Sequence, residues 1–94
     1  MKVIWSPTAT RNLDAIWNHI AQDNIDAADR TAERLHSASL ILVDYPRMGR
    51  PGRQRKTREL VVAGTPYILI YRETPGRIDI VRVIHCKQDY PAKG

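Results

Sequence analysis

The chain has 94 residues, of which 43% are hydrophobic and 27% are charged, a composition typical of a folded protein with room for one hydrophobic core. We therefore expect a single domain over residues 1–94. No apolar run approaches the ~20 residues that cross a bilayer, and the one cysteine, Cys86, allows no internal disulfide. These features predict a cytoplasmic protein with no membrane partner.

Charge is segregated along the chain, whose net charge is +5. Residues 1–44 hold four basic and six acidic residues, a balance of −2, whereas residues 45–94 hold eleven basic and four acidic residues, a balance of +7. A one-sided positive potential concentrates polyanions near one part of the surface. Nucleic acid, the ribosome and an acidic protein are all suitable partners.

The first elements are a short strand and a helix. Lys2–Trp5 alternates and is rich in β-branched and aromatic residues, which predicts a strand. Ser6 is a natural N-cap, and Pro7 fits the first helical position, so we expect a helix from there to about Asp23. Its apolar face has helical spacing and consists of Leu13, Ile16, Trp17 and Ile20.

A second helix follows at once. Asn24 can cap it, and Tyr45-Pro46 should end it, because proline disfavours helix in the residue before it. Its buried stripe is expected to be Ala28, Ala32, Leu35, Ala38 and Leu42. The small residues in this stripe let two helix axes approach closely, which predicts a helical hairpin that packs on a sheet.

The segment 45–56 is basic and rich in glycine and proline, so we expect it to lack regular structure. It contains no acidic residue to face its cations, which are Arg47, Arg50, Arg53, Arg55 and Lys56. Three strands are predicted after it, at Thr57–Ala63, Tyr67–Arg72 and Arg77–His85, and their short connections require antiparallel hairpins. The predicted fold is α+β, in the order β-α-α-β-β-β, with a helical hairpin on a small, mainly antiparallel sheet.

The last strand is apolar on both faces, so its pattern does not decide which face the helices cover. Strict alternation places Arg82 with three isoleucines on one face and His85 on the other. The isoleucines are Ile78, Ile80 and Ile84.

Three strand arginines are candidates for an anion site: Arg58, Arg72 and Arg82. Antiparallel pairing is expected to bring them onto one surface, where a guanidinium held by a sheet presents a bidentate fork to phosphate or carboxylate. The arginines of the basic segment would be mobile and would steer association instead. The alternative is that each strand arginine is solvated or pairs with a nearby acid.

His85 is the candidate for acid–base chemistry, because imidazole titrates near neutrality and the residue would lie beside arginines at the sheet edge. It could take a proton from a ribose 2′-hydroxyl, with Lys87 or Tyr90 serving the leaving oxygen. The alternative is structural: His85 caps the strand and Tyr90 packs against the helices. His19 and His36, on the helices, are expected to be solvated surface residues.

No metal site or cofactor site is predicted. The three histidines and one cysteine lack ligand spacing on a shared element. The run Gly49-Arg50-Pro51-Gly52 leads to arginines and a strand instead of a helix N-terminus, so a phosphate-binding loop is not expected either.

Taken together, these features resemble the RelE/ParE superfamily of bacterial type II toxin–antitoxin toxins over nearly the whole span from Val3 to Pro91. The order and spacing of several short motifs carry the resemblance. They are Ile4-Trp5-Ser6-Pro7 with Ala9 and Leu13, Asp26-Ala27-Ala28, Pro46 with Gly49-Arg50, Thr57-Arg58-Glu59-Leu60, Tyr67 with Tyr71-Arg72, and Val83-Ile84-His85 running to Tyr90-Pro91.

The resemblance implies a toxin neutralised by a cognate acidic antitoxin, with which it would form a hetero-oligomer. Two targets are open. The ParE branch, which the chain resembles more in its long helical hairpin, its Arg58-Glu59-Leu60 strand and its short tail after His85, inhibits DNA gyrase by binding and is not an enzyme. The RelE branch consists of mRNA endonucleases that act with the ribosome.

Each target implies its own residues. Target binding would use the basic segment and the strand arginines: Arg50, Arg53, Arg55, Lys56, Arg58 and Arg72. Only an endoribonuclease would need a catalytic set: His85, Arg58, Arg82, Lys87 and Tyr90. The cations of the basic segment are nearly all arginine, and no glutamate sits just before the sheet as a partner base, which departs from the nuclease pattern. A third interpretation is a plain nucleic-acid-binding module.

Overall fold

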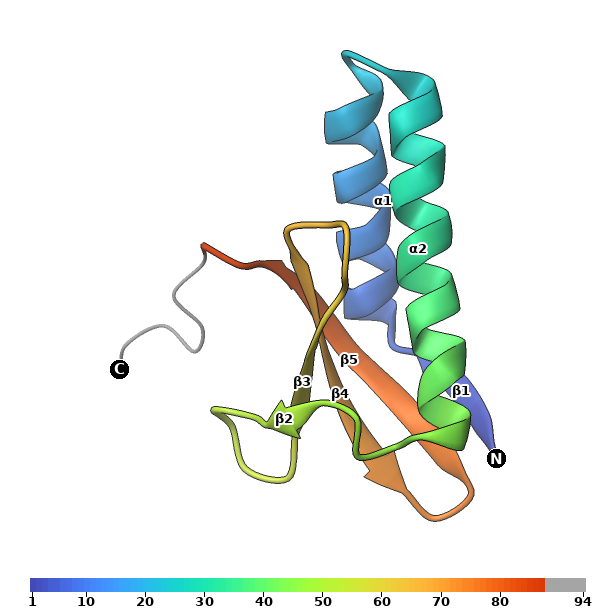
Figure 1. Ribbon diagram of the computed structural model, residues 1–94, viewed down its shortest axis with the longest axis vertical. Coiled ribbons are helices and arrows are strands. Elements are labelled where there is room, and N and C mark those ends of the chain that lie inside the picture. Colours follow the sequence, from blue (N-terminus) through green and yellow to red (C-terminus); the bar gives the residue numbers. More distant parts are fainter. Residues whose placement is uncertain (88–94) are drawn as a thin grey trace.

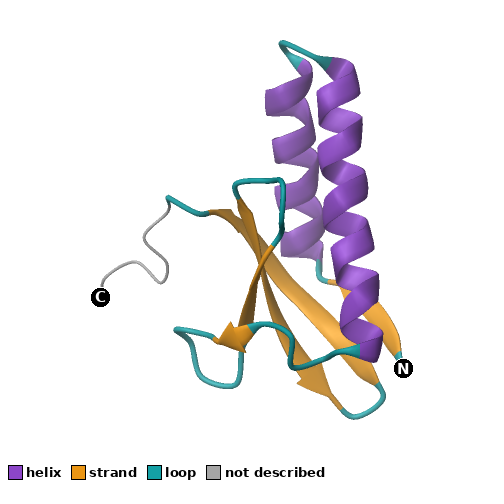
Figure 2. Cartoon of the chain, in the orientation of Figure 1, coloured by secondary structure: helices purple, strands orange, loops and turns teal. Residues whose placement is uncertain are grey.

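The computed structural model describes residues 1–87, which form two helices on one side of a five-stranded sheet (Figure 1). In chain order the elements are β1 (Lys2–Trp5), α1 (Pro7–Ala21), α2 (Ile25–Asp44), β2 (Arg50–Pro51), β3 (Arg58–Val61), β4 (Tyr67–Thr74) and β5 (Arg77–His85). Figure 2 shows the helices side by side as one layer, with the strands as the other. In the part that the structure describes, no helix has both the length and the apolar character that crossing a membrane requires.

Both helices begin where the predicted caps place them. The Ser6 hydroxyl accepts a hydrogen bond from the Ala9 N–H at 3.0 Å and donates to the Val81 carbonyl at 2.8 Å, so the cap also ties α1 to β5. The Asn24 side chain accepts from the Ala27 N–H at 3.0 Å at the start of α2. The predicted helical hairpin is confirmed.

The strand order in the sheet is β1-β5-β4-β3-β2. β1 pairs with β5 in parallel, and every other neighbouring pair is antiparallel. The predicted mainly antiparallel sheet is therefore confirmed. β1 and β2 form its two edges, and the helical hairpin connects them across one face.

The main core lies between the helices and one face of the sheet. Leu35 and Leu42 of α2 meet Leu69, Tyr71 and other apolar side chains of β4 and β5, and all four are fully buried. A smaller cluster of three buried isoleucines lies on the opposite sheet face: Ile68, Ile70 and Ile84. Both faces of the central strands are thus apolar. For this reason the pattern of apolar and polar residues in the sequence did not show which face the helices cover.

A β-bulge in the last strand corrects the face assignment. Ile70 pairs with Arg82, whereas the next residue, Tyr71, pairs with Ile80, so Val81 is the extra residue. After this bulge the alternation reverses. Ile78, Ile80 and Val83 face the helices, whereas Arg82 and Ile84 lie on the opposite face, so the prediction that the three isoleucines share one face with Arg82 is wrong.

The basic segment also contains regular structure that its glycines and prolines did not predict. Gly49 lies against Tyr71 so closely that a Cβ at residue 49 would be 2.8 Å from the Tyr71 hydroxyl. That hydroxyl donates to the Pro46 carbonyl at 2.7 Å and accepts from the Gly49 N–H at 2.9 Å. The chain is thereby held beside the sheet, where Arg50–Pro51 pairs with β3.

Changing Tyr71 to Phe removes this hydroxyl and leaves the buried Gly49 N–H without its acceptor. We expect the free energy of unfolding to fall by ~1–3 kcal/mol, measured by urea denaturation. Tyr67→Phe is the matched control, since Tyr67 is also buried but its hydroxyl makes no hydrogen bond with the described residues. Equal losses in the two variants would contradict the role given to the Tyr71 hydroxyl.

Candidate functional site

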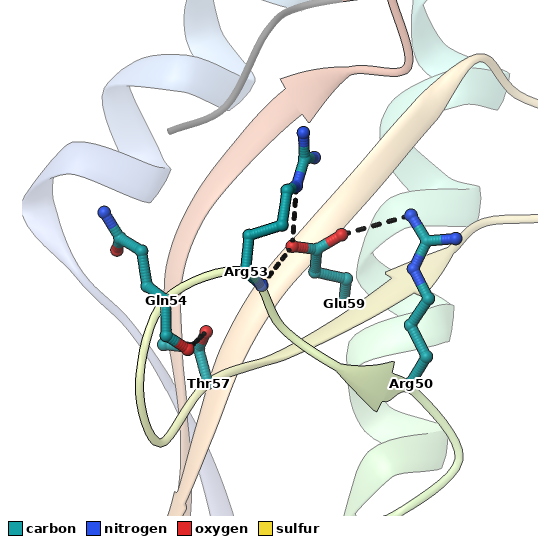
Figure 3. Close-up of polar contacts among 5 residues, drawn as sticks. All are labelled: Arg50, Arg53, Gln54, Thr57 and Glu59. Carbon is teal, nitrogen blue, oxygen red and sulfur yellow. Dashed lines mark hydrogen bonds and ion pairs between the residues drawn. The ribbon is translucent and has the colours of Figure 1, made fainter. Parts of the chain in front are cut away.

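A buried glutamate holds the basic segment in place. Glu59 lies in β3 opposite Ile70, on the sheet face away from the helices, and its side chain is 1% exposed. One carboxylate oxygen accepts from the Arg50 guanidinium at 3.1 Å, and the other accepts from the Arg53 backbone N–H at 2.9 Å and the Arg53 guanidinium at 3.2 Å (Figure 3). We call these three residues the Glu59 clamp.

The clamp keeps Glu59 ionised despite its burial. Burial by itself would raise the pKa of Glu59, but the hydrogen bonds from Arg53 and Arg50 outweigh this effect, and the pKa lies below its ordinary value of 4.5. The expectation that the cations of residues 45–56 face no acid is wrong for Arg50 and Arg53, because their acid comes three residues after the segment. A single glutamate inside an apolar strand, directly after a run of arginines, was the signal for this pairing.

The turn between β2 and β3 has a defined geometry, unlike the mobile segment that we expected. The Gly52 N–H donates to the Thr57 carbonyl at 2.7 Å, and the Thr57 hydroxyl donates to the Gln54 carbonyl at 2.6 Å. Lys56 adopts a positive φ of 63°, and a Cβ at Gly52 would be 2.3 Å from the Thr57 hydroxyl, so the turn depends on that glycine. Arg55 and Lys56 are therefore presented at the tip of a hydrogen-bonded turn.

The strand arginines do not share one face of the sheet. Arg58 pairs with Tyr71, whose ring faces the helices, and its guanidinium donates to the Gly49 carbonyl at 2.7 Å. Arg72 and Arg82 lie on the opposite face, because they alternate with Tyr71 and Val83. The expected grouping is therefore wrong for Arg58, since the register of β3 against β4 sets its side.

Arg58 instead joins cations of the basic segment around a shallow hollow of about 420 Å³. The cations that line it are Arg47, Arg55, Lys56 and Arg58. A second hollow, of about 660 Å³, shares Arg55 and Lys56 with the first and adds Arg72. Among the described residues that line the two hollows, Glu73 is the only acid.

His85 lies apart from these arginines, on the helix-facing side of β5. Its ring packs edge-on against Tyr67 at a centroid distance of 5.5 Å, and its Nδ1 accepts from the Lys87 N–H at 3.1 Å. It lines a hollow of about 260 Å³ together with Asn12 and His19, so His19 lies nearer to it than expected. The prediction that His85 lies beside the arginines is wrong, and Tyr90 lies outside the described residues.

The remaining histidine and the potential metal ligands do not form a site within the described residues. His36 is exposed on α2, as expected. Within residues 1–87 no three His, Cys, Asp or Glu side chains are close enough together to hold a metal ion, so we assign no residue to a metal or cofactor.

The structure contains an apolar groove of about 400 Å³ between α2 and β3, which the sequence analysis did not predict. Ile41, Met48 and Val61 line it and are about half exposed, at 45%, 51% and 54%. β2 pairs with β3 only at Arg58 and Glu59, so in residues 1–87 no strand covers the edge of β3 beyond them. Ile41 lies beside the buried stripe of α2, and this extra apolar residue was the only signal for the groove.

The fold agrees with comparisons to known proteins. A family model described as the ParE toxin of the type II toxin–antitoxin system parDE matches residues 3–90. The chain belongs to this family. It is accordingly a type II toxin–antitoxin toxin of the ParE/RelE superfamily, as the sequence motifs indicated.

Individual relatives and one solved structure are similar over most of the chain. The chain is 42% identical to the toxin Y4kP of Sinorhizobium fredii over 90 residues, covering 96% of this chain and 93% of that protein. It is 39% identical to toxin RelE2 of Caulobacter vibrioides, covering 89% and 93% of the two chains. A solved structure of a chromosomal ParDE toxin–antitoxin system from P. aeruginosa superposes with a TM-score of 0.81 at 24% identity, covering 90% of this chain and 95% of that one.

The Glu59 clamp predicts a specific pH dependence of stability. Because the folded-state pKa of Glu59 is depressed, the clamp stabilises the fold above the unfolded pKa, and this contribution is lost as the pH falls through the lower folded value. Glu59→Gln should therefore lower the free energy of unfolding by ~1–3 kcal/mol at neutral pH. The difference from the wild type should shrink once the pH drops well below 4.5.

Thermal unfolding across this pH range measures the difference. Glu73→Gln is the control, since Glu73 is exposed and makes no ion pair with the described residues. A Glu59→Gln effect that is the same at neutral and acid pH would show that the charge of Glu59 does not contribute.

Proposed function

We propose that this toxin acts in the cytoplasm by binding DNA gyrase and that a cognate antitoxin neutralises it. The observation that supports binding over catalysis is the separation of the candidate nuclease residues. Arg82 and His85 lie on opposite faces of β5, and Arg58 lies two strands away in β3, where the Gly49 carbonyl holds its guanidinium. Acid–base chemistry at one phosphate needs such groups within about 2.6–3.2 Å of the reacting atoms.

The basic turn supplies a suitable surface for target binding. Arg55 and Lys56 are exposed at its tip, and the clamp fixes the turn to the sheet. Arg50 and Arg53 serve first as clamp residues, so their contribution to target binding is partly indirect. Arg72, on the other sheet face, extends the surface toward the second hollow.

The apolar groove suits the antitoxin. A protein partner that lays a strand along β3 would satisfy the backbone groups beyond Glu59 and place apolar side chains over Ile41 and Val61. Met48 lines the groove, and the preceding residue, Arg47, lines the first basic hollow. An acidic antitoxin that fills the groove would therefore also meet the cations beside it.

Replacing His85 by Gln distinguishes binding from mRNA cleavage. The change keeps a polar side chain and removes the titratable imidazole. We expect growth inhibition and inhibition of purified gyrase to stay within about twofold of the wild type, whereas a general acid or base would lose ~10²-fold or more in rate. Loss of toxicity in a folded His85→Gln protein, or mRNA cuts at codon positions before any DNA breaks appear, would favour the endoribonuclease.

Replacing Val61 by Glu tests the antitoxin groove. A buried charge there should weaken antitoxin binding at least ~10-fold, a change of about 1.4 kcal/mol, and cells that express both proteins should stop growing. Leu40→Glu is the matched control, because Leu40 is 50% exposed on α2 but does not line the groove. Calorimetric titration should show normal antitoxin affinity for the control, and equal losses in both variants would place the antitoxin elsewhere.

A further inference from the structure

The two basic hollows differ chemically from the apolar groove. Among the described residues that line them there is no aromatic and no large aliphatic side chain. Protein interfaces obtain most of their affinity from aromatic or aliphatic anchors in desolvated pockets. The groove along α2 offers such anchors, whereas the two hollows offer charge alone.

The cations are spread over two hollows that share lining residues. The first hollow holds Arg47 and Arg58, the second holds Arg72, and Arg55 and Lys56 line both. Glu73 is the one acid among the described lining residues, so several negative charges in a row are needed to balance the cations. A nucleic-acid backbone supplies charges in a row, whereas a single phosphate or carboxylate does not.

Three of the cations belong to fixed parts of the structure. The Arg58 guanidinium is fixed by the Gly49 carbonyl, which leaves its fork oriented in the first hollow. Arg55 and Lys56 belong to the turn that the Glu59 clamp fastens to β3. No ion pair within residues 1–87 involves Arg47, Arg55, Lys56 or Arg58.

From this geometry we propose that the two hollows form a preformed track for the phosphodiester backbone of duplex DNA. Proteins that bind single strands add aromatic side chains on which bases stack, and none of the described residues that line the track is aromatic. Recognition is therefore of the duplex backbone and independent of sequence. The track goes beyond the proposed action on gyrase, since it predicts that the toxin itself contacts DNA.

The experiment measures binding of the purified toxin to a short labelled DNA duplex by fluorescence anisotropy at several salt concentrations. The logarithm of the binding constant should fall linearly with the logarithm of salt concentration, with a slope of about −0.9 per phosphate neutralised. Arg55→Gln combined with Lys56→Gln should weaken binding ~10-fold or more at low salt and reduce the slope by about 2.

Two further variants distinguish binding to the track from attraction by the net charge of the protein. Arg11→Gln combined with Arg30→Gln removes the same charge from helix residues outside both hollows, and it should change the affinity much less. Glu59→Gln makes the protein more positive but loosens the clamp, so a preformed track predicts weaker DNA binding, whereas attraction by net charge predicts tighter binding. The folded fraction of each variant is checked first by thermal unfolding.

Several outcomes would overturn the proposal. They are no binding to the duplex, equal losses in the two double variants, tighter binding by Glu59→Gln, or tighter binding of single-stranded DNA or polyglutamate than of duplex DNA. Gyrase inhibition is assayed separately on the same variants, so failure of the track and failure of the proposed target are distinguishable.

Discussion

The hydroxyl of Tyr71 connects the helical hairpin to the basic half of the chain, since it donates to the Pro46 carbonyl and accepts from the Gly49 N–H. The side chain is fully buried in the core, and its burial raises the pKa of the phenol, so the hydroxyl stays neutral and can both donate and accept. With residues 46–49 held there, β2 reaches the edge of β3, and the Gly49 carbonyl is placed to accept from Arg58. The clamp at Glu59 then fixes the remainder of the turn. The position of the cationic surface thus depends on a buried tyrosine as well as on the two arginines of the clamp.

Most of the fold could be predicted because its signals are local. The caps at Ser6 and Asn24 and the short connections between strands each act over a few residues, and all are present in the structure. The bulge at Val81 could not be predicted, because it depends on how two strands of different curvature align. The same holds for the site. Its cationic character was visible in the sequence, but the side of the sheet that receives Arg58 follows from a register that no local pattern encodes.

The pairing of Glu59 shows that the charge balance of a short segment does not reveal which of its cations are paired in the fold. Arg50 and Arg53 belong to a run of cations that has no acid within it, yet both point to one carboxylate that the turn brings back beside them. Such a carboxylate is costly to bury alone, and the two arginines with the Arg53 N–H compensate for the cost. The basic segment therefore contains two kinds of arginine: those that set the shape of the turn, and those, such as Arg55, that remain available to a partner.

The spacing of the candidate nuclease residues favours binding as the mode of action. Arg58 pairs with Tyr71 and His85 pairs with Tyr67, so their positions differ by four residues along β4, or about 13 Å at ~3.3 Å per residue. They also lie in strands on opposite sides of β4, which adds two strand spacings of about 4.8 Å each. With the Arg58 guanidinium also held by the Gly49 carbonyl, the two side chains do not converge on one phosphate. Such dispersed cations are suited to a large polyanionic or acidic surface, where each contact is made separately and none has to transfer a proton.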